Sequence, residues 1–137
     1  MPVNRYATAA GKKFQRDVMK YLRDDRGLDA ENLVLTGAED EGDIILKYVP
    51  GYEHDKPAGN VGPDRQVRII LEAKREKGFH LADWVKQAEV ERDNYSKHRY
   101  LRSEEVGFVV VHYRRQHGVP KAYITTTLDE WLRGQGL

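Results

Sequence analysis

The fold of this chain is decided by one stretch, VRIILEAK at residues 67–74, in which an apolar run ends in a glutamate and a lysine. The branched aliphatic side chains predict a buried β-strand, and a strand places residues two apart on the same face. Glu72 and Lys74 are therefore expected to point the same way at the end of this strand. Because charges at the end of a buried strand are costly without a partner, the pair indicates a functional site.

A second strand is predicted at residues 43–49, where Asp43 precedes the apolar residues 44–46. If the two strands are neighbours, Asp43 and Glu72 lie side by side, and carboxylates about 4 Å apart repel by roughly 4 kcal/mol at an effective dielectric of about 20. A proton or a cation must relieve that repulsion. An oxygen-only site with few protein ligands suits Mg²⁺ or Mn²⁺, so the predicted ligands are Asp43, Glu72 and the carbonyl of Ala73.

The lysine of the triplet completes a possible reaction centre. A divalent ion at the carboxylates can polarise a phosphodiester and help to generate hydroxide. Lys74, on the same face as Glu72, can then hold the attacking water or stabilise charge that develops on the phosphate. A plain Glu–Lys ion pair at the end of a strand stays open as the alternative, because such triplets are common.

Hydrophobic periodicity and turn residues organise the rest of the chain. Helices are predicted at about residues 9–26, at about residues 82–97 and in a short segment after Thr127. The other predicted strands cover residues 32–36, 106–113 and 119–125. Thr8 can cap the first helix and Gly27 can end it. The Pro- and Gly-rich residues 50–64 indicate a long loop, at about 50–65. The order α-β-β-β-α-β-β-α predicts an α/β fold with a mixed sheet flanked by helices.

Size and composition suit one domain over residues 1–137 with one core. No apolar run approaches the length of about 20 residues that a membrane span needs. The absence of cysteine excludes disulfides and thiolate metal sites and fits a reducing compartment, so a cytoplasmic location is expected. No phosphate-loop or Gly-x-Gly-x-x-Gly sequence supports a nucleotide cofactor.

With these features, the chain resembles the PD-(D/E)XK nuclease superfamily, in the branch of archaeal-type and phage Holliday-junction resolvases. The segments that carry the resemblance are Gly42-Asp43-Ile44-Ile45, Ile70-Leu71-Glu72-Ala73-Lys74, Gln87-Ala88-Glu89 and Gly11-Lys12-Lys13-Phe14-Gln15. The resemblance spans roughly residues 9 to 125 and implies a restriction-endonuclease-like fold.

The resemblance also implies roles for single residues. Asp43 and Glu72 would be metal ligands, Lys74 the catalytic lysine, and Gln87 a supporting residue of the following helix. Many relatives carry a glutamate in the first helix where this chain has Gln15, whose neutral amide is a weaker magnesium ligand but can still bind a metal-bound water.

Basic residues near these motifs are candidates for binding DNA phosphates, which supply affinity but no sequence information. The first 26 residues hold seven Lys or Arg against three Asp or Glu, although the net charge of the chain is only +1. The candidates are Arg75, Lys77, Lys12, Lys13 and Arg5. An ordinary basic surface is the alternative, and for Arg75 the two interpretations weigh equally. The acidic residues 39–41 are expected to form a solvated loop rather than to supply a second metal ligand.

The expected function is a Mg²⁺- or Mn²⁺-dependent DNA endonuclease that acts on branched DNA such as Holliday junctions. Resolving a four-way junction needs two paired cuts, so a two-fold homodimer is expected with that substrate. One alternative is a repair or restriction-type nuclease on duplex, flap or single-stranded DNA. Another is a binding module of the same fold without catalysis, which Gln15 keeps open. The last is an unrelated α/β domain.

Overall fold

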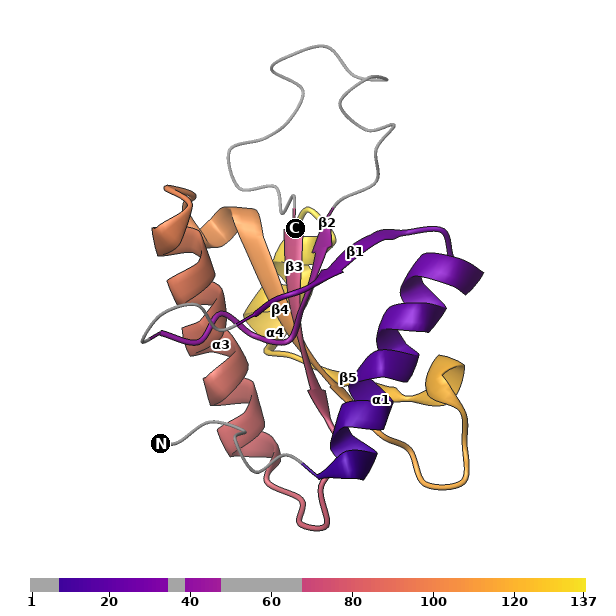
Figure 1. Ribbon diagram of the computed structural model, residues 1–137. Helices are drawn as coiled ribbons and strands as arrows, with labels where there is room; N and C mark the ends of the chain where they lie inside the picture. Colours follow the sequence, from indigo (N-terminus) through magenta and orange to yellow (C-terminus); the bar gives the residue numbers. More distant parts are fainter. Residues whose placement is uncertain (1–7, 35–38, 48–67) are drawn as a thin grey trace.

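A mixed sheet of five strands, in the order β1-β2-β3-β4-β5, forms the centre of the molecule (Figure 1). The computed structural model describes residues 8–34, 39–47 and 68–137. The strands are β1 Asp29–Asn32, β2 Ile44–Lys47, β3 Arg68–Lys74, β4 Val106–His112 and β5 Tyr123–Thr125. The helices are α1 Ala9–Lys20, which continues as a π-helical turn at Tyr21–Asp25, α3 Leu81–His98 and α4 Leu128–Gly134. Short 3₁₀ turns cover Ser103–Glu105 and Val119–Lys121.

The pairing of the strands makes the sheet mixed. β2 runs antiparallel to both β1 and β3, and β5 runs antiparallel to β4. β3 and β4 are parallel, so the chain must cross back between them, and α3 makes that crossover. The predicted order of helices and strands is confirmed for these elements. The chain therefore has an α/β fold with a mixed sheet flanked by helices.

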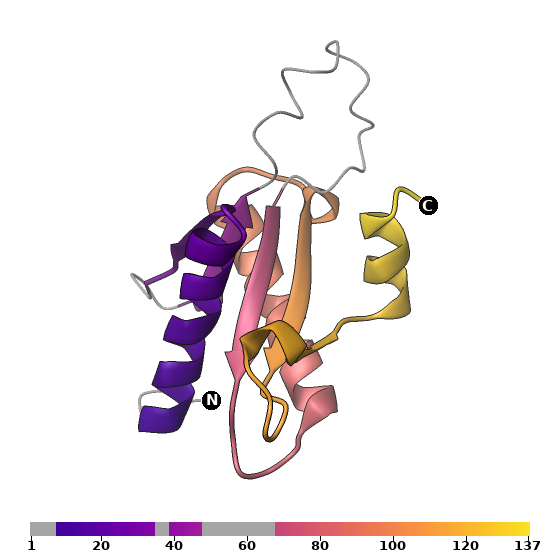
Figure 2. The same ribbon diagram turned by 90° about the vertical axis from the view of Figure 1, so that its right-hand side faces the viewer.

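Helices α1 and α3 cover opposite faces of the sheet (Figures 1 and 2). On one face, α3 packs on residues that include Ile45, Ile70 and Phe108. On the other face, α1 packs on their neighbours Ile44 and Leu71. Burial on both faces explains why the central strands read as nearly continuous apolar runs. It also means that alternate residues of one strand meet different helices.

Capping residues determine where the helices begin and end. The side-chain oxygen of Thr8 accepts a hydrogen bond from the Gly11 N–H at 3.0 Å, and that of Thr127 accepts one from the Glu130 N–H at 3.2 Å. Gly27 follows the π-helical turn with a φ of +65°, a conformation that glycine adopts without strain. The caps predicted at Thr8 and Gly27 are confirmed. No helix in the described ranges is long and apolar enough to cross a membrane.

Two predicted strands are wrong in their bounds. The strand expected at 32–36 lies earlier, at Asp29–Asn32. Only Ala30 of this edge strand is buried, so the strand has no apolar run of its own. The segment 119–125 pairs with β4 only from Tyr123 onward, because Val119–Lys121 forms a 3₁₀ turn. Pro120 lies in that turn, and proline cannot donate a hydrogen bond to a sheet. The predicted loop at 50–65 lies outside the described residues.

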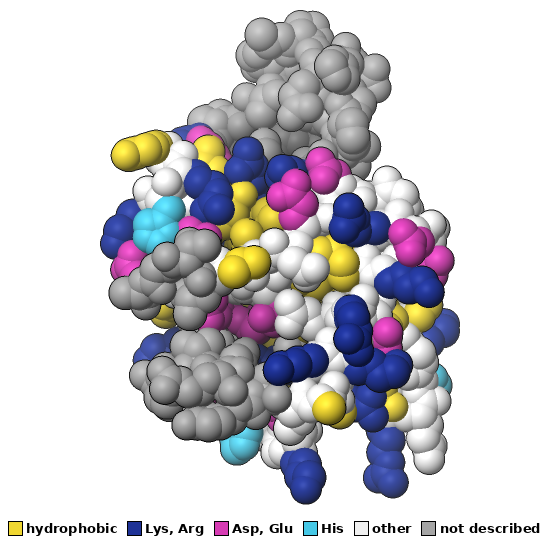
Figure 3. All heavy atoms as spheres, in the orientation of Figure 1, with side chains coloured by type: hydrophobic (Ala, Val, Ile, Leu, Met, Phe, Trp, Pro, Cys, Tyr) yellow, Lys and Arg dark blue, Asp and Glu magenta, His cyan; other side chains and the backbone are white. Residues whose placement is uncertain are grey.

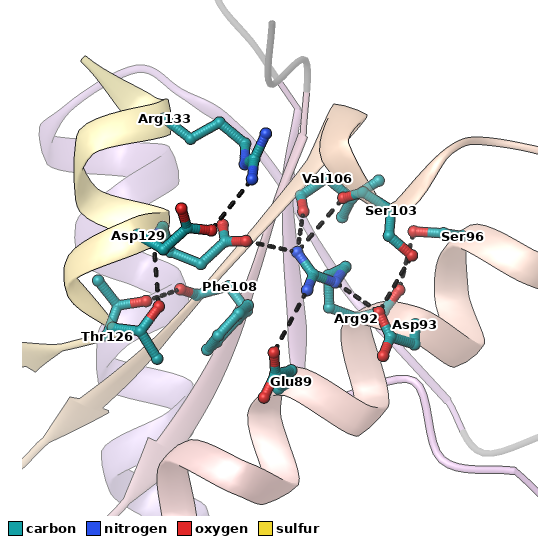
Figure 4. A network of polar contacts seen from close by, with 12 residues as sticks. Glu89, Arg92, Asp93, Ser96, Ser103, Val106, Phe108, Thr126, Asp129 and Arg133 are labelled. Atoms are coloured by element: carbon teal, nitrogen blue, oxygen red, sulfur yellow. Dashed lines mark hydrogen bonds and ion pairs between the residues drawn. The ribbon is translucent and has the colours of Figure 1, made fainter. Parts of the chain in front are cut away.

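Arg92 of α3 joins α4 to the rest of the molecule (Figure 4). Its guanidinium donates to Glu130 Oε1 of α4 at 2.7 Å and to the carbonyl oxygens of Val106 at 3.0 Å and Ser103 at 3.3 Å. It also donates to Asp93 Oδ1 at 2.7 Å. The side chains of Arg92 and Glu130 are only 8% and 7% exposed. This buried ion pair holds a helix of seven residues against β4.

Candidate active site

Asp43 and Glu72 meet where β2 begins and β3 ends. The register pairs Ile44 with Leu71, so one further step brings Asp43 opposite Glu72. The Ala73 N–H donates a hydrogen bond of 2.9 Å to Oδ2 of Asp43, which fixes the carboxyl group against the end of β3. The expected placement of the two carboxyl groups on neighbouring strands is therefore correct.

A glycine with an unusual backbone conformation leads the chain into Asp43. Gly42 is buried and has a φ of +105°, which side-chain-bearing residues rarely adopt. A Cβ atom on Gly42 would lie 2.5 Å from Cγ2 of Ile70. The Gly42 N–H donates to Oδ1 of Asp40 at 2.9 Å, which closes the turn before the strand.

Replacing Gly42 with alanine is expected to lower the free energy of unfolding by about 2 kcal/mol or more, because both backbone strain and a steric clash oppose the new side chain. Gly27→Ala is the matched control. Gly27 also has a positive φ, +65°, but a Cβ there would meet nothing within 4 Å. Denaturant unfolding of both variants measures the difference, and equal losses would show that the contact with Ile70 is unimportant.

Glu72 and Lys74 point toward α3, as their spacing predicts. Glu72 is 0% exposed and Lys74 5% exposed. Ile70, two residues before Glu72, belongs to the core cluster under α3. The site therefore lies between the end of β3 and α3, on the face of the sheet away from α1.

Helix α3 contributes two further polar side chains to this place. Lys74 Nζ donates to Oε1 of Gln87 at 3.1 Å, and Nε2 of Gln87 donates to Oε2 of Glu91 at 3.1 Å. Gln87 thus contacts the lysine, and its supporting role stays a prediction. Glu91 is only 2% exposed and was not found from the sequence. The signal was present, because Glu91 continues the buried helical positions of Trp84, Ala88 and Tyr95.

Burial and mutual repulsion disfavour the ionised forms of the three carboxyl groups. Burial, followed by the charge of Glu72, raises the pKa of Asp43 well above its usual value. Burial, followed by the adjacent Glu91 carboxyl, raises the pKa of Glu72 in the same way. Burial also raises the pKa of Glu91 to about 7. No donor among the described residues reaches either carboxyl oxygen of Glu72 or Oε1 of Glu91. These oxygens need protons or a cation.

The donor set fits a hard divalent cation only in part. Within the described ranges, no three Asp, Glu, His or Cys side chains form a group that could hold a metal ion. Mg²⁺ commonly binds through one or two carboxylates and keeps several waters, a requirement that Asp43 and Glu72 can meet. The unpartnered oxygens of Glu72 are the observation that favours such an ion. Ala73 contributes its N–H to Asp43, and the use of its carbonyl as a ligand stays a prediction.

Gln15 belongs to α1 and makes no side-chain hydrogen bond among the described residues. Its neighbours Phe14 and Val18 pack on the other face of the sheet. The start of α1 nevertheless lies near the end of β3, because a Cβ on Gly11 would be 3.7 Å from the Arg75 carbonyl oxygen. The first turn of α1, with Lys12 and Lys13, is therefore close to the end of the strand that carries Lys74.

The basic candidates lie on more than one side of the site. The guanidinium carbon of Arg75 lies 3.8 Å from the centre of the Tyr113 ring, and Tyr113 packs edge-on against Phe14 on the α1 side. Lys12 and Lys77 are exposed, and Lys13 forms an exposed ion pair with Asp17 at 2.8 Å. Figure 3 shows many basic side chains over α1, with acidic side chains among them, and further charges of both signs over the rest of this face. Arg5 lies outside the described residues.

The acidic segment before Asp43 is anchored to the end of α3. The ring nitrogens of His98 lie 2.5 Å from Glu41 Oε2 and 2.8 Å from Glu39 Oε1. Arg99 donates to Glu41 at 2.8 Å, and Asn94 donates to the Asp40 carbonyl at 2.8 Å. These contacts bind residues 39–41 to α3, so this segment is held by specific partners.

Replacing His98 with alanine is expected to destabilise the protein in acid more than in base. Hydrogen bonds to Glu41 and Glu39 raise the pKa of His98 above 6.5 in the folded state. Its contribution is therefore fully present below pH 6.5 and is lost as the pH rises through the folded pKa. The His98 hydrogen bond lowers the pKa of Glu39 below 4.5, so the Glu39 contribution is lost as the pH falls through that lowered pKa. Melting temperatures of wild type and His98→Ala from pH 5 to about 9 test this, with exposed His117→Ala as control. A constant difference across this range would contradict it.

Comparisons of the chain with protein-family models, with curated proteins and with solved structures find no match. The fold and the site thus define an α/β protein with a buried cluster of carboxyl groups and one lysine at the end of a central strand.

Proposed function

We propose that this chain is a metal-dependent DNA endonuclease with the restriction-endonuclease-like fold of the PD-(D/E)XK nucleases. The observation that carries the proposal is that Asp43, from a distant segment of the sequence, meets Glu72 and Lys74 at the adjoining ends of β2 and β3. The unpartnered oxygens of Glu72 support a cation at this place. The resemblance of the motifs around these residues supports the assignment to this nuclease class.

Each residue has a definable part in phosphodiester hydrolysis. Asp43 and Glu72 would hold Mg²⁺ or Mn²⁺, which when bound supplies Lewis-acid assistance and a more acidic water. Lys74 presents its ammonium group from the same strand face and can orient the attacking water or stabilise charge on the phosphate. Gln87 accepts a hydrogen bond from Lys74 and so limits where the ammonium group lies.

Branched DNA, such as a Holliday junction, is the proposed substrate, and a two-fold homodimer would supply the paired cuts. The basic residues Lys12, Lys13, Arg75 and Lys77, with Arg5 before them, would contact phosphates. This role in phosphate binding is supported by the position of the first turn of α1, which lies close to the end of β3 and brings positive charge near Lys74.

Cleavage of a synthetic four-way junction tests the proposal, with a linear duplex of the same sequence beside it. Wild type should cut the junction with Mg²⁺ or Mn²⁺ and not with EDTA, and Glu72→Ala should not cut. The isosteric Glu72→Gln, with its melting temperature, guards against misfolding as the cause. Equal cutting of the duplex would favour a repair or restriction-type nuclease. Junction binding without cleavage in either metal would favour a binding module, and no manganese binding in calorimetry would favour a plain ion pair.

A further inference from the structure

Glu91 is a charged residue at a position that the fold treats as core. It is 2% exposed and shares its helix face with the buried Trp84, Ala88 and Tyr95. Only its Oε2 atom has a hydrogen-bond partner among the described residues, the Nε2 atom of Gln87. A carboxylate in such surroundings opposes folding, because its desolvation is not balanced by a cation of its own. Packing therefore does not explain Glu91.

The chemistry of its neighbours gives Glu91 a defined effect. An ammonium group only donates hydrogen bonds, an ionised carboxylate only accepts them, and the glutamine amide has one end of each kind. Gln87 lies between the two, with Oε1 3.1 Å from Lys74 Nζ and Nε2 3.1 Å from Glu91 Oε2. When Glu91 is ionised, its carboxylate thus requires the amide to turn its NH₂ group toward position 91. The carbonyl end must then face Lys74.

We propose that Glu91 is a positioning residue of the site, which holds the Lys74 ammonium group in place by fixing the orientation of the Gln87 side chain. The inference rests on the proposed nuclease function, since that function makes the position of Lys74 important. It extends the site to a residue that lies 17 positions beyond the lysine in the sequence and on another element.

The informative variant is Glu91→Gln, which keeps the size of the side chain and lets it either donate or accept. Only Lys74 then still dictates the orientation of the Gln87 amide, so the ammonium group is held less firmly. Junction cleavage is expected to fall about 10- to 100-fold, the size of effect found when residues that orient metal ligands are lost. The KM for junction DNA should not change. The melting temperature at pH 8 should stay the same or rise, because a buried carboxylate beside Glu72 has been removed.

Two comparisons distinguish a positioning role of Glu91 from a structural role. Gln87→Leu interrupts the chain of hydrogen bonds, and the double variant Gln87→Leu/Glu91→Gln should lose no more activity than Gln87→Leu alone, because the two residues act as a unit. Glu89→Gln is the matched control. Glu89 lies on the same helix with a side chain 50% exposed, and its replacement should leave cleavage unchanged.

A second measurement does not depend on activity. In protein labelled with ¹⁵N-lysine, an ammonium group fixed in a buried hydrogen bond exchanges its protons slowly, so it gives a resolved Nζ signal, identified by its absence in Lys74→Met. The signal should persist in Glu89→Gln and disappear in Gln87→Leu and Glu91→Gln.

Wild-type cleavage and signal in Glu91→Gln would overturn the inference, and so would a fall in melting temperature that matches the loss of activity. If the wild type cuts no DNA, the proposed function fails, and the signal still decides whether Glu91 positions Lys74.

Discussion

Replacing Lys74 with alanine is expected to abolish DNA cleavage, a loss of at least about 100- to 1000-fold, and to leave DNA binding nearly intact. Lys74 is only 5% exposed and its charge acts on Asp43 and Glu72, so it is poorly placed to add general affinity for the DNA backbone. Its expected effect is on charge that develops during the reaction. Single-turnover cleavage and gel-shift binding of the same junction measure the two quantities separately.

The matched control for this prediction is Lys77→Ala. Lys77 follows three residues later and is exposed, so its loss should weaken binding modestly and leave the cleavage rate of bound DNA unchanged. The melting temperature of Lys74→Ala must show that the variant is folded. If binding falls to the same extent as cleavage, Lys74 acts in DNA binding and the proposed role is wrong.

Replacing Arg92 with methionine is expected to lower the free energy of unfolding by about 3–5 kcal/mol, the usual cost of removing one partner of a buried ion pair. The substitution removes the guanidinium that donates to Glu130 Oε1 and to the Val106 and Ser103 carbonyl oxygens, all of them in a buried place. A loss of this size is a large fraction of the stability of a typical domain. Denaturant unfolding at low temperature measures it.

The control for Arg92 is Arg102→Met. Arg102 forms a 3.1 Å ion pair with Glu105, but its side chain is 50% exposed, so the expected loss is about 0–1 kcal/mol. The double variant Arg92→Met/Glu130→Leu should recover part of the stability, because both charges of the buried pair are then replaced by apolar side chains. Equal losses for Arg92→Met and Arg102→Met would mean that the Arg92–Glu130 pair does not hold α4.

Much of the fold could be predicted from local patterns of apolar residues in the sequence. The apolar runs around residues 44–46 and 67–71 predicted the two strands that meet at the site, and the period of two correctly placed Glu72 and Lys74 on one face. The helical spacing of Trp84 and Ala88 predicted α3 and the face that it buries. These features are local, so the sequence pattern records them directly.

Two of the errors, at β1 and at Glu91, occurred where a residue's structure depends on distant neighbours. β1 exposes most of its side chains because it is an edge strand, and its pairing with β2 rather than its own composition makes it a strand. Glu91 was overlooked because a glutamate in a helix normally indicates an exposed position. Its helical spacing with Trp84 and Ala88 indicated a buried position, but only the packing of α3 on the sheet shows that it lies beside Glu72.

The sequence by itself determined the order of the elements and the strand face shared by Glu72 and Lys74, because residue periodicity and capping act over a few positions. Tertiary structure decided which residues join that pair. The crossover through α3 brings Gln87 and Glu91 to Lys74, whereas Gln15 and Arg75 belong to the side covered by α1. The physical reason is that the face of the sheet covered by each helix follows from the combined burial of many apolar side chains. No single motif encodes that outcome.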